Sequence, residues 1–305
     1  MQQPAFISYR ALLRDGLTSS EIQAMQPNGS LRRVRRGSYL SHPEPSATPE
    51  AEHRELARAT WTGLAAGSVL SHLSAAIVHG LPVLGRPPSR VNVTRTTGGH
   101  GRADTLLHLR VCPLPPDEVV ERDGVMVTSL ARTVADVART SSLDQAVAVA
   151  DAALRAGLER GDLERSLGRC DRRPGIARAR RVAAFADPGA DGPGESVSRV
   201  RMQQAGLPSP VLQWRIGYSD GHETFSDFAW PELRTLGEFD GKVKYGRLVK
   251  PDQTPADVVM AEKRRENRIR GQGWWLVRWG WDDLADVRGF ERLIRDGFAN
   301  APTIR

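Results

Sequence analysis

Apolar and polar residues follow one another along this chain with the periods of short helices and strands. Near the start, residues 9–13 form a short amphipathic stretch, and residues 16–22 have the pattern of a turn followed by a helix start. Thr18 can cap this helix, because Glu21 lies three positions later as in a capping box. Residues 26–29 (QPNG) break the helix, and the basic segment 31–40 predicts a hairpin.

The middle of the chain has a mixed pattern that indicates both helices and strands. Residues 41–49 are rich in Pro and Ser and predict a linker. Beyond it, the pattern predicts helices over 51–66, 68–79, 128–140, 143–157 and 172–186, and strands over 91–94 and 106–111. The Pro- and Gly-rich segment 186–194 is the clearest boundary in the chain.

The last third of the chain has the plainest order of elements. The pattern predicts a helix over 195–205, strands over 211–217, 224–230 and 234–240, a long loop, a helix over 256–270, a strand over 274–279 and a helix over 283–298. Ser219-Asp220-Gly221 is expected to turn the first hairpin. This α-β-β-β-α-β-α order predicts a mixed sheet flanked by helices.

A length of 305 residues is too long for one ordinary core, so several domains are expected. The expected fold class is a multidomain α/β (α+β) protein. The helix, turn, helix and basic hairpin of residues 1–45 match the layout of a winged helix-turn-helix. A mixed α/β domain is expected over 50–185, and an αβββαβ domain over 194–300.

The composition points towards a polyanionic partner, above all nucleic acid. The net charge is +7 and the pI is about 10.0. However, 39 of the 43 basic residues are Arg, as GC-rich coding alone would produce, so the bulk charge raises this expectation only modestly. The four lysines are more informative, because all of them fall in one stretch of 22 residues, a pattern that predicts a need for ammonium groups there: Lys242, Lys244, Lys250 and Lys263.

Two basic segments are candidate DNA contacts. In the predicted hairpin, four arginines in five positions would suit phosphate contacts from a wing: Arg32, Arg33, Arg35 and Arg36. The alternative is a solvated basic edge strand. In the predicted helix 256–270, the candidates are Lys263, Arg264 and Arg268. Glu262, Arg265 and Glu266 share the face of that helix that meets the sheet, which indicates either an active-site rim or an ordinary salt-bridge network.

Other patterns indicate a cytoplasmic protein with no membrane partner. No run of about 18 apolar residues occurs, and the first residues lack a basic segment followed by an apolar one. Cys112 and Cys170 match no metal or redox spacing. Two buried thiols in a reducing cytosol are therefore expected, with a disulfide as the alternative.

Three carboxylates on neighbouring predicted strands carry the clearest chemistry. Glu238 and Asp240 line one side of their strand, and Asp227 can lie beside Glu238 in an antiparallel pair. Carboxylates gathered on an apolar sheet face would repel one another unless a hard cation lay between them. We therefore predict that Asp227, Glu238 and Asp240 bind Mg²⁺ or Mn²⁺, with a purely structural role as the alternative.

Two of the lysines extend this predicted site. If the strand continues, Lys242 and Lys244 fall on the same side as Glu238 and Asp240. An ammonium group there could orient an attacking water or neutralise a developing oxyanion.

The last third of the chain resembles the PD-(D/E)XK nuclease superfamily, in particular its very-short-patch-repair-like branch. The resemblance lies in segments 226–231 (SDFAWP), 237–245 (GEFDGKVKY), 262–266 (EKRRE) and 273–279 (GWWLVRW). It implies a restriction-endonuclease-like fold and metal-dependent hydrolysis of DNA phosphodiesters. Asp227 and Glu238 would then be metal ligands, and Glu195 would be the helical acid of the catalytic site; the alternative for Glu195 is a structural acid that the helix dipole favours at a helix start.

One departure from the superfamily pattern matters. Asp240 stands where a lysine usually follows two residues after the acid. Either Lys242 or Lys244 has taken over the lysine's role, or the nuclease site is weak or inactive.

The first two-thirds of the chain are similar to AbiEi-type antitoxins of type IV toxin–antitoxin systems. The similarity lies in segments 17–22, 36–39, 70–76 and 127–133. It implies a winged helix-turn-helix that binds promoter DNA, with a cognate toxin as a further partner. Two hypotheses follow: a DNA-binding metal-dependent endonuclease, or a non-catalytic DNA-binding regulator or antitoxin with a degenerate nuclease fold.

Overall fold

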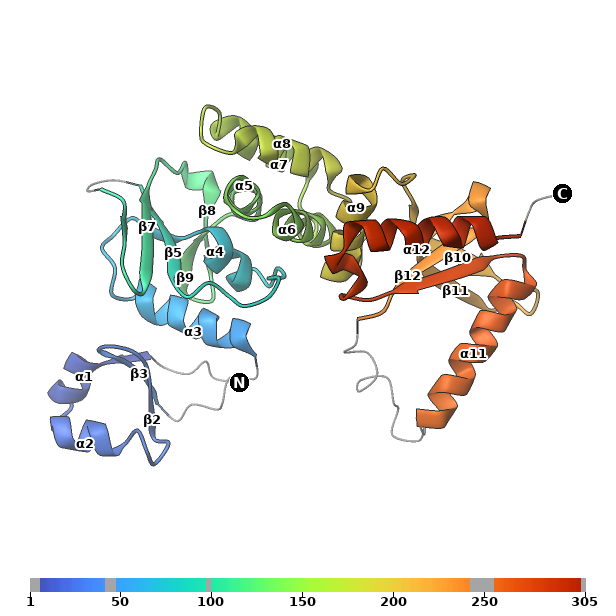
Figure 1. Cartoon of the computed structure of the whole chain (residues 1–305). Helices are drawn as coiled ribbons and strands as arrows, with labels where there is room; N and C mark the ends of the chain where they lie inside the picture. Colours follow the sequence, from blue (N-terminus) through green and yellow to red (C-terminus); the bar gives the residue numbers. More distant parts are fainter. Residues whose placement is uncertain (1–5, 42–47, 97–99, 242–254, 303–305) are drawn as a thin grey trace. The chain divides into compact units, whose positions relative to one another are not determined.

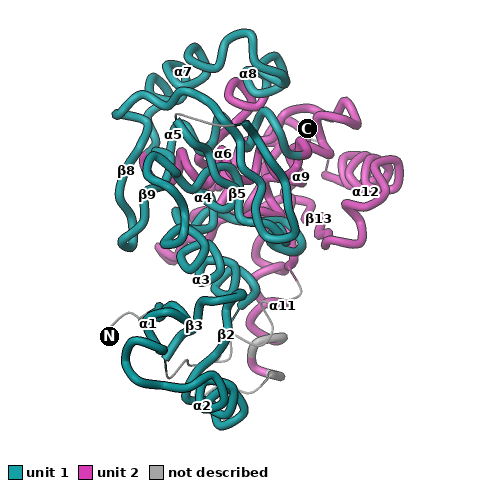
Figure 2. Tube along the Cα trace, turned by 90° about the vertical axis from the view of Figure 1, so that its left-hand side faces the viewer, with its two compact units in different colours: residues 1–141, 158–181 teal, residues 142–157, 182–305 magenta. Residues whose placement is uncertain are grey.

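The computed structural model describes residues 6–41, 48–96, 100–241 and 255–302 (Figure 1). Over these ranges the chain has a mixed α/β architecture with three sheets. It divides into two compact units, Met1–Ser141 with Leu158–Arg181 and Ser142–Gly157 with Val182–Arg305 (Figure 2). Over the described ranges, no helix has the length and apolar character needed to cross a membrane.

The first unit begins with a small three-stranded antiparallel sheet and two short helices. Its elements are β1 (Phe6–Ser8), α1 (Tyr9–Arg14), α2 (Ser19–Ala24), β2 (Leu31–Arg35) and β3 (Ser38–Ser41), with strand order β1-β3-β2. The predicted capping box is confirmed: the Thr18 hydroxyl accepts from Glu21 N at 3.3 Å, and Glu21 Oε2 accepts from Thr18 N at 2.7 Å. A small apolar core closes this part, formed by Leu12, Ile22, Leu31 and Tyr39.

A six-stranded mixed sheet forms the rest of the first unit. Its order is β6-β7-β5-β4-β9-β8, in which β5 pairs with β7 and β4 with β9 in parallel. The strands are β4 (Ser68–Leu70), β5 (Val91–Arg95), β6 (Arg102–Ala103), β7 (Leu107–Val111), β8 (Val119–Arg122) and β9 (Val125–Thr128). The helices are α3 (Pro49–Trp61), α4 (His72–Val78), α5 (Leu130–Thr140) and α7 (Arg160–Arg169), with a 3-10 turn at Pro116–Glu118.

The predicted single helix over 68–79 is wrong in its first part. Ser68–Leu70 is strand β4, which is completely buried between β5 and β9. The burial of Val69 and Leu70 inside the sheet outweighs their fit to a helical pattern. Strands β8 and β9 and helix α7 were not predicted at all.

The second unit has the predicted order of elements. After α6 (Leu143–Arg155) come α9 (Pro193–Gln204), β10 (Val211–Gly217), β11 (Glu223–Trp230), β12 (Thr235–Phe239), α11 (Pro255–Gly271), β13 (Trp275–Trp279) and α12 (Val287–Asn300). Two 3-10 turns lie at Pro231–Leu233 and Asp283–Ala285, and α8 (Ile176–Phe185) spans the boundary between the units. The sheet order is β10-β11-β12-β13, antiparallel except for the parallel pair β12–β13.

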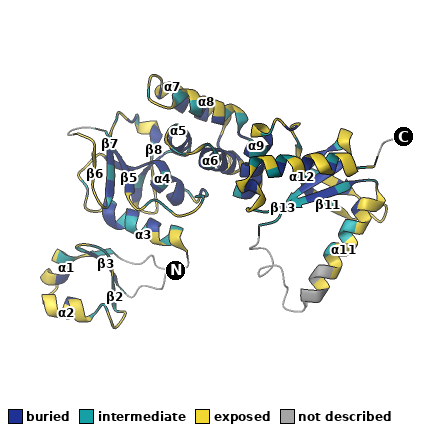
Figure 3. Cartoon of the chain, viewed as in Figure 1, coloured by how far each residue is buried: buried dark blue, intermediate teal, exposed yellow. Residues whose placement is uncertain are grey.

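Helices pack on both faces of this four-stranded sheet, in which β12 and β13 are largely buried and the edge strand β10 is mostly half-buried or exposed (Figure 3). On one face, Ile269 of α11 packs against Leu236 and Leu276. Alternate residues of β13 face the other way, where the Trp279 ring lies 5.3 Å from the Phe290 ring of α12. The Trp279 indole also donates to Ser198 Oγ of α9 at 2.8 Å, which places α9 on this second face.

A buried ion pair ties α6, which the sequence grouped with the middle region, to the second unit. Asp151 of α6 is fully buried. Its Oδ2 accepts from Arg199 Nη1 at 2.7 Å and from Ser196 Oγ at 2.8 Å, both in α9, and its Oδ1 accepts from Asp187 N at 2.8 Å. Every oxygen of this carboxylate is therefore satisfied.

We predict that Asp151→Ala lowers the free energy of unfolding by about 3–5 kcal/mol, because it leaves the buried Arg199 guanidinium without its counter-ion. Urea denaturation of the full chain measures this loss. The matched control is Glu291→Ala, which removes an exposed pair with Arg295 and should cost at most about 1 kcal/mol. Equal losses in the two variants would mean that the Asp151 pair does not hold α6 to α9.

Candidate acidic site of the second unit

Glu195 lies in the first turn of α9, directly after Gly192, Pro193 and Gly194. Its side chain is buried, with 8% of the residue exposed. Glu195 Oε2 accepts from Asp191 N at 2.8 Å and from Gln213 Nε2 at 3.2 Å. Among the described residues, no cationic side chain forms an ion pair with this carboxylate.

The environment of Glu195 favours its neutral form. Burial and, after it, the negative charge of Asp227 raise the pKa of Glu195 to about 7, against the opposing effect of the hydrogen bonds from Asp191 N and Gln213. A buried carboxyl group with such a pKa beside a second acid is typical of proton-transfer or metal sites.

Asp227 is the second acid at this position. It lies in β11, and its Oδ2 accepts from Phe239 N of β12 at 2.8 Å. On the other side of β11, the register pairs Leu212 with Phe228 and Trp214 with Ser226, so Gln213 lies opposite Asp227. Gln213 has a left-handed backbone with φ +48°, an irregular geometry that accompanies the contact of its amide with Glu195. The structure therefore brings Glu195 and Asp227 together.

Glu238 has a different environment, because two arginines bind its carboxylate. Glu238 Oε2 accepts from Arg265 Nη1 of α11 at 3.2 Å and from Arg278 Nε of β13 at 3.1 Å, and Oε1 accepts from Arg265 Nη2. The two arginines also bind Glu262 and Glu266 of α11. Although burial would lower the pKa of Arg265, its bonds to Glu238 and Glu262 raise it.

The charged face of α11 is therefore a salt-bridge network in the structure. This was one of the two interpretations of the spacing of Glu262, Arg265 and Glu266. The sequence offered no means of finding the partners of Glu238, because Arg265 and Arg278 lie 27 and 40 residues further along the chain.

The remaining predicted site residues have the following places. Asp240 follows the end of β12, and its backbone N donates to Trp279 O at 2.8 Å. Lys242 and Lys244 lie outside the described residues. Within the ranges that the structure describes, no group of three or more His, Cys, Asp or Glu side chains is placed to hold a metal ion.

The arginines of the N-terminal hairpin fall into two classes. Arg32 pairs with Glu55 of α3, and Arg35 donates from Nε to Ser38 Oγ at 3.3 Å, with a pKa that burial lowers. Arg33 and Arg36 are exposed. Of these four arginines, all of which lie in the described residues, only Arg33 and Arg36 present an exposed guanidinium group without an ion pair or hydrogen bond of the kind that Arg32 and Arg35 form.

The candidate DNA-contacting residues of α11 also differ in whether their side chains are free to reach a ligand. Lys263 and Arg264 are exposed. Arg268 donates to Asp220 Oδ2 at 2.6 Å, and its guanidinium lies 3.9 Å from the centre of the Tyr218 ring. Arg268 is thus fixed against the β10–β11 turn, whereas Lys263 and Arg264 are accessible to a polyanion.

Comparison with known proteins gives distant relatives. No family model matches the chain. Two Mycobacterium tuberculosis proteins, described as uncharacterized protein MT2308 (strain CDC 1551 / Oshkosh) and uncharacterized protein Rv2248 (strain ATCC 25618 / H37Rv), are each 33% identical over 162 residues. The match covers 53% of this chain and 57% of each relative.

One solved structure is similar over a longer stretch. It is the crystal structure of the RV2827C protein from Mycobacterium tuberculosis, with 16% identity and a TM-score of 0.39, covering 70% of this chain and 84% of that one. At this identity and TM-score, the likeness does not define a shared fold.

The raised pKa of Glu195 gives a pH-dependent prediction. A carboxyl group whose pKa is higher in the folded state than in the unfolded state destabilises the fold when it is ionised. For Glu195 this cost is absent below pH 4.5, the unfolded-state pKa, and is fully present above pH 7. Glu195→Gln, which keeps an acceptor for Asp191 N, should therefore gain stability over the wild type as pH rises from 4 to 8, by about 3 kcal/mol at pH 8 without divalent metal.

Urea denaturation of both proteins at pH 4 to 8 in the presence of a chelator measures this difference. A difference in unfolding free energy that stays constant across the range would show that Glu195 titrates normally.

Proposed function

We propose that this chain is a DNA-binding protein whose second unit is a restriction-endonuclease-like domain that hydrolyses DNA phosphodiesters with a divalent metal. The observation that carries the proposal is the pair formed by Glu195 and Asp227, in which burial and like charge raise the pKa of Glu195 to about 7. The αβββαβ order of the second unit and the four sequence segments that resemble PD-(D/E)XK nucleases support it.

The donor set of this pair fits Mg²⁺ or Mn²⁺. Magnesium is commonly held by one or two carboxylates, with water and substrate phosphate oxygens as the other ligands. Glu195 and Asp227 would hold the ion, and water and phosphate oxygens would complete its ligands. When bound, the metal would supply activation of water and stabilisation of charge on the phosphate.

The proposal gives a different role to each group of side chains. Glu195, which has a pKa of about 7 in the absence of metal, would give up its proton when the ion binds to its carboxylate. The network of Arg265 and Arg278 with Glu238 fixes β12 and β13 to α11, and so positions the strand that carries Phe239 N against Asp227. Lys242 and Lys244 remain candidates for the lysine role. Lys263 and Arg264 would contact the DNA backbone.

A second candidate function has specific support. The carboxylate of Glu238 is bound by two arginines, and Asp240 replaces the usual lysine. Both features suit a non-catalytic DNA-binding regulator or an antitoxin with a degenerate nuclease fold, for which a cognate toxin would be the further partner.

A plasmid-nicking assay with Mg²⁺ or Mn²⁺ separates the two functions. If Glu195 and Asp227 hold the metal, Glu195→Gln and Asp227→Asn should each lower the nicking rate by more than the roughly 10–100-fold that loss of an outer-shell partner costs. Glu291→Gln, which changes a partly exposed carboxylate of α12 that lies outside the proposed site, should nick as the wild type does.

Wild-type protein that does not nick, or variants that nick as fast as the wild type, would end the nuclease proposal. In the first case, DNA binding by an inactive wild type would favour the regulator.

The exposed arginines of the hairpin give a separate prediction for DNA binding. Each phosphate contact contributes a slope of about −0.9 to the dependence of log affinity on log salt. Arg33→Ala combined with Arg36→Ala should therefore weaken binding and reduce the steepness of that dependence by about 2.

Gel-shift titrations of duplex DNA at several salt concentrations measure both quantities. The control variant combines Arg165→Ala with Arg180→Ala, two exposed arginines of the same unit that pair with Asp162 and Asp171. Unchanged affinity and salt slope in the Arg33 and Arg36 variant would remove the hairpin as a DNA contact.

A further inference from the structure

The first unit contains a cavity of about 320 Å³ whose wall is rich in arginine. Arg110 of β7, Arg132 and Arg139 of α5 and Arg173 after α7 line it, together with His72 and Asp136. None of these residues belongs to the acidic site of the second unit.

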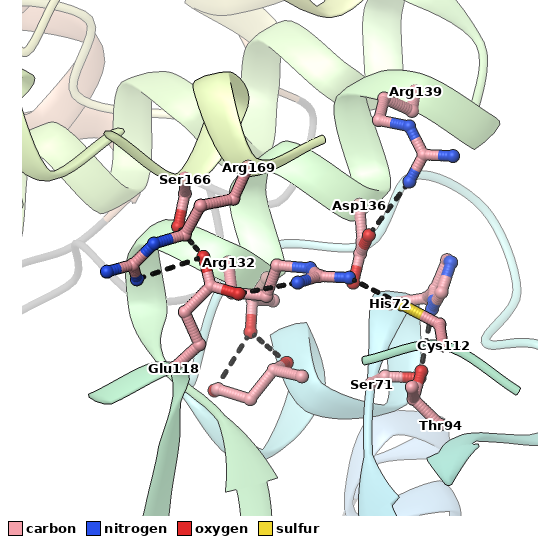
Figure 4. Close-up of polar contacts among 12 residues, drawn as sticks. Ser71, His72, Thr94, Cys112, Glu118, Arg132, Asp136, Arg139, Ser166 and Arg169 are labelled. Carbon is pink, nitrogen blue, oxygen red and sulfur yellow. Dashed lines mark hydrogen bonds and ion pairs between the residues drawn. The ribbon is translucent and has the colours of Figure 1, made fainter. Parts of the chain in front are cut away.

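The inner wall of this arginine pocket is held by a buried charge network (Figure 4). Arg132 is 1% exposed. Its Nη1 lies 2.5 Å from Glu118 Oε2, and its Nε lies 3.0 Å from Asp136 Oδ2. Ser166 Oγ donates to the other Glu118 oxygen at 2.6 Å. The charge of Arg132 is thus neutralised, and its guanidinium is rigidly placed.

The pocket has more arginines than carboxylates that could neutralise them. Arg139 Nη1 shares Asp136, through Oδ1 at 3.0 Å. Arg110 donates to the amide oxygen of Asn92 at 3.0 Å, and Arg173 donates to Cys112 Sγ. Among the described residues, no carboxylate forms an ion pair with Arg110 or Arg173. In the described part of the chain, two cations therefore face the cavity without a carboxylate in ion-pair contact.

This surplus of positive charge is unfavourable in itself. Burial lowers the pKa of Arg110, and the nearby Arg139 charge lowers it further, against the attraction of Asp136. Buried like charges of this kind cost free energy, which a bound anion would offset.

The backbone conformation of His72, which also lines the pocket, is a second unusual feature of this wall. His72 is buried and has a backbone φ of +53°, a left-handed conformation that is strained for a side chain other than Gly, Asn or Asp. Its Nδ1 lies 2.9 Å from Ser71 Oγ, which also accepts from Thr94 Oγ1 at 2.9 Å. Burial and the surrounding arginines hold the pKa of His72 well below its usual value, so the ring is neutral.

Two guanidinium groups of the pocket donate hydrogen bonds to Cys112. Its Sγ accepts from Arg132 Nη2 at 3.1 Å and from Arg173 Nη1, and the residue is half-buried. A sulfur atom is a weak acceptor for two charged donors, so an anion at this place would bind them more strongly.

We propose that the arginine pocket binds the phosphate group of a small molecule, with Arg110 and Arg173 as its principal ligands. Planar guanidinium groups match phosphate oxygens in bidentate geometry. A cavity of about 320 Å³ is at the small end of the range for small-molecule sites, which suits inorganic phosphate or a mononucleotide.

Isothermal titration calorimetry of the full chain in a low-chloride buffer tests this proposal with three probes. These are inorganic phosphate, deoxyadenosine 5′-monophosphate and deoxyadenosine. The monophosphate is expected to bind and the nucleoside is not. If inorganic phosphate binds as tightly as the nucleotide, the phosphate group is the whole ligand; if it binds more weakly, the pocket also recognises the nucleoside part.

Arg110→Gln and Arg173→Gln should each weaken phosphate or nucleotide binding at least about tenfold, since each removes charged hydrogen bonds. Arg165→Gln, an exposed arginine of α7, is the control and should bind as the wild type does. Because Arg110→Gln removes a surplus charge, its melting temperature should not fall, which separates loss of binding from loss of folding.

A labelling experiment tests the location of the site. Bound phosphate should slow alkylation of Cys112 by iodoacetamide in the wild type but not in Arg173→Gln, while the buried Cys170 serves as internal control by peptide mass spectrometry. The proposal is overturned if neither phosphate nor the nucleotide binds, if both glutamine variants bind as the wild type does, or if binding leaves Cys112 labelling unchanged.

Discussion

Neutralisation of buried charge is the constraint on which both units of this protein depend. Most charged groups in the interior are matched: Asp151 by Arg199 in the second unit, and Arg132 by Glu118 and Asp136 in the first. These pairs hold helices together, because removing one partner would leave the other charged and without solvent. Against this background, Glu195 is exceptional, since its buried carboxyl group has amide donors but no cation among the described residues.

Local signals in the sequence were enough to predict much of the fold. The order of elements in the second unit and the Thr18–Glu21 capping box follow from periodicity and from residues three positions apart, and both are confirmed. Strand β4 was predicted as helix because its assignment depends on β5 and β9, which are distant in the sequence. Strands β8 and β9 and helix α7 were missed because their short segments carry weak patterns of their own.

The candidate site could be predicted only in part, for the same reason. The sequence identified Glu195, Asp227 and Glu238 as acids of interest, but their environments depend on non-local contacts. Glu238 is bound by Arg265 and Arg278, while Glu195 owes its raised pKa to burial and to Asp227. The hairpin arginines looked equivalent in sequence, yet Glu55 and Ser38 engage Arg32 and Arg35 and leave Arg33 and Arg36 exposed.

The most direct test of the account is calorimetric titration of the full chain with Mn²⁺ at pH 7, in buffers of different ionisation enthalpy. Because the pKa of Glu195 is about 7, binding between Glu195 and Asp227 should release about half a proton per ion. Glu195→Gln should abolish that release and weaken binding. Mn²⁺ binding that releases no proton, or that is equally tight in Glu195→Gln, would contradict the assignment of these two carboxylates as the metal site.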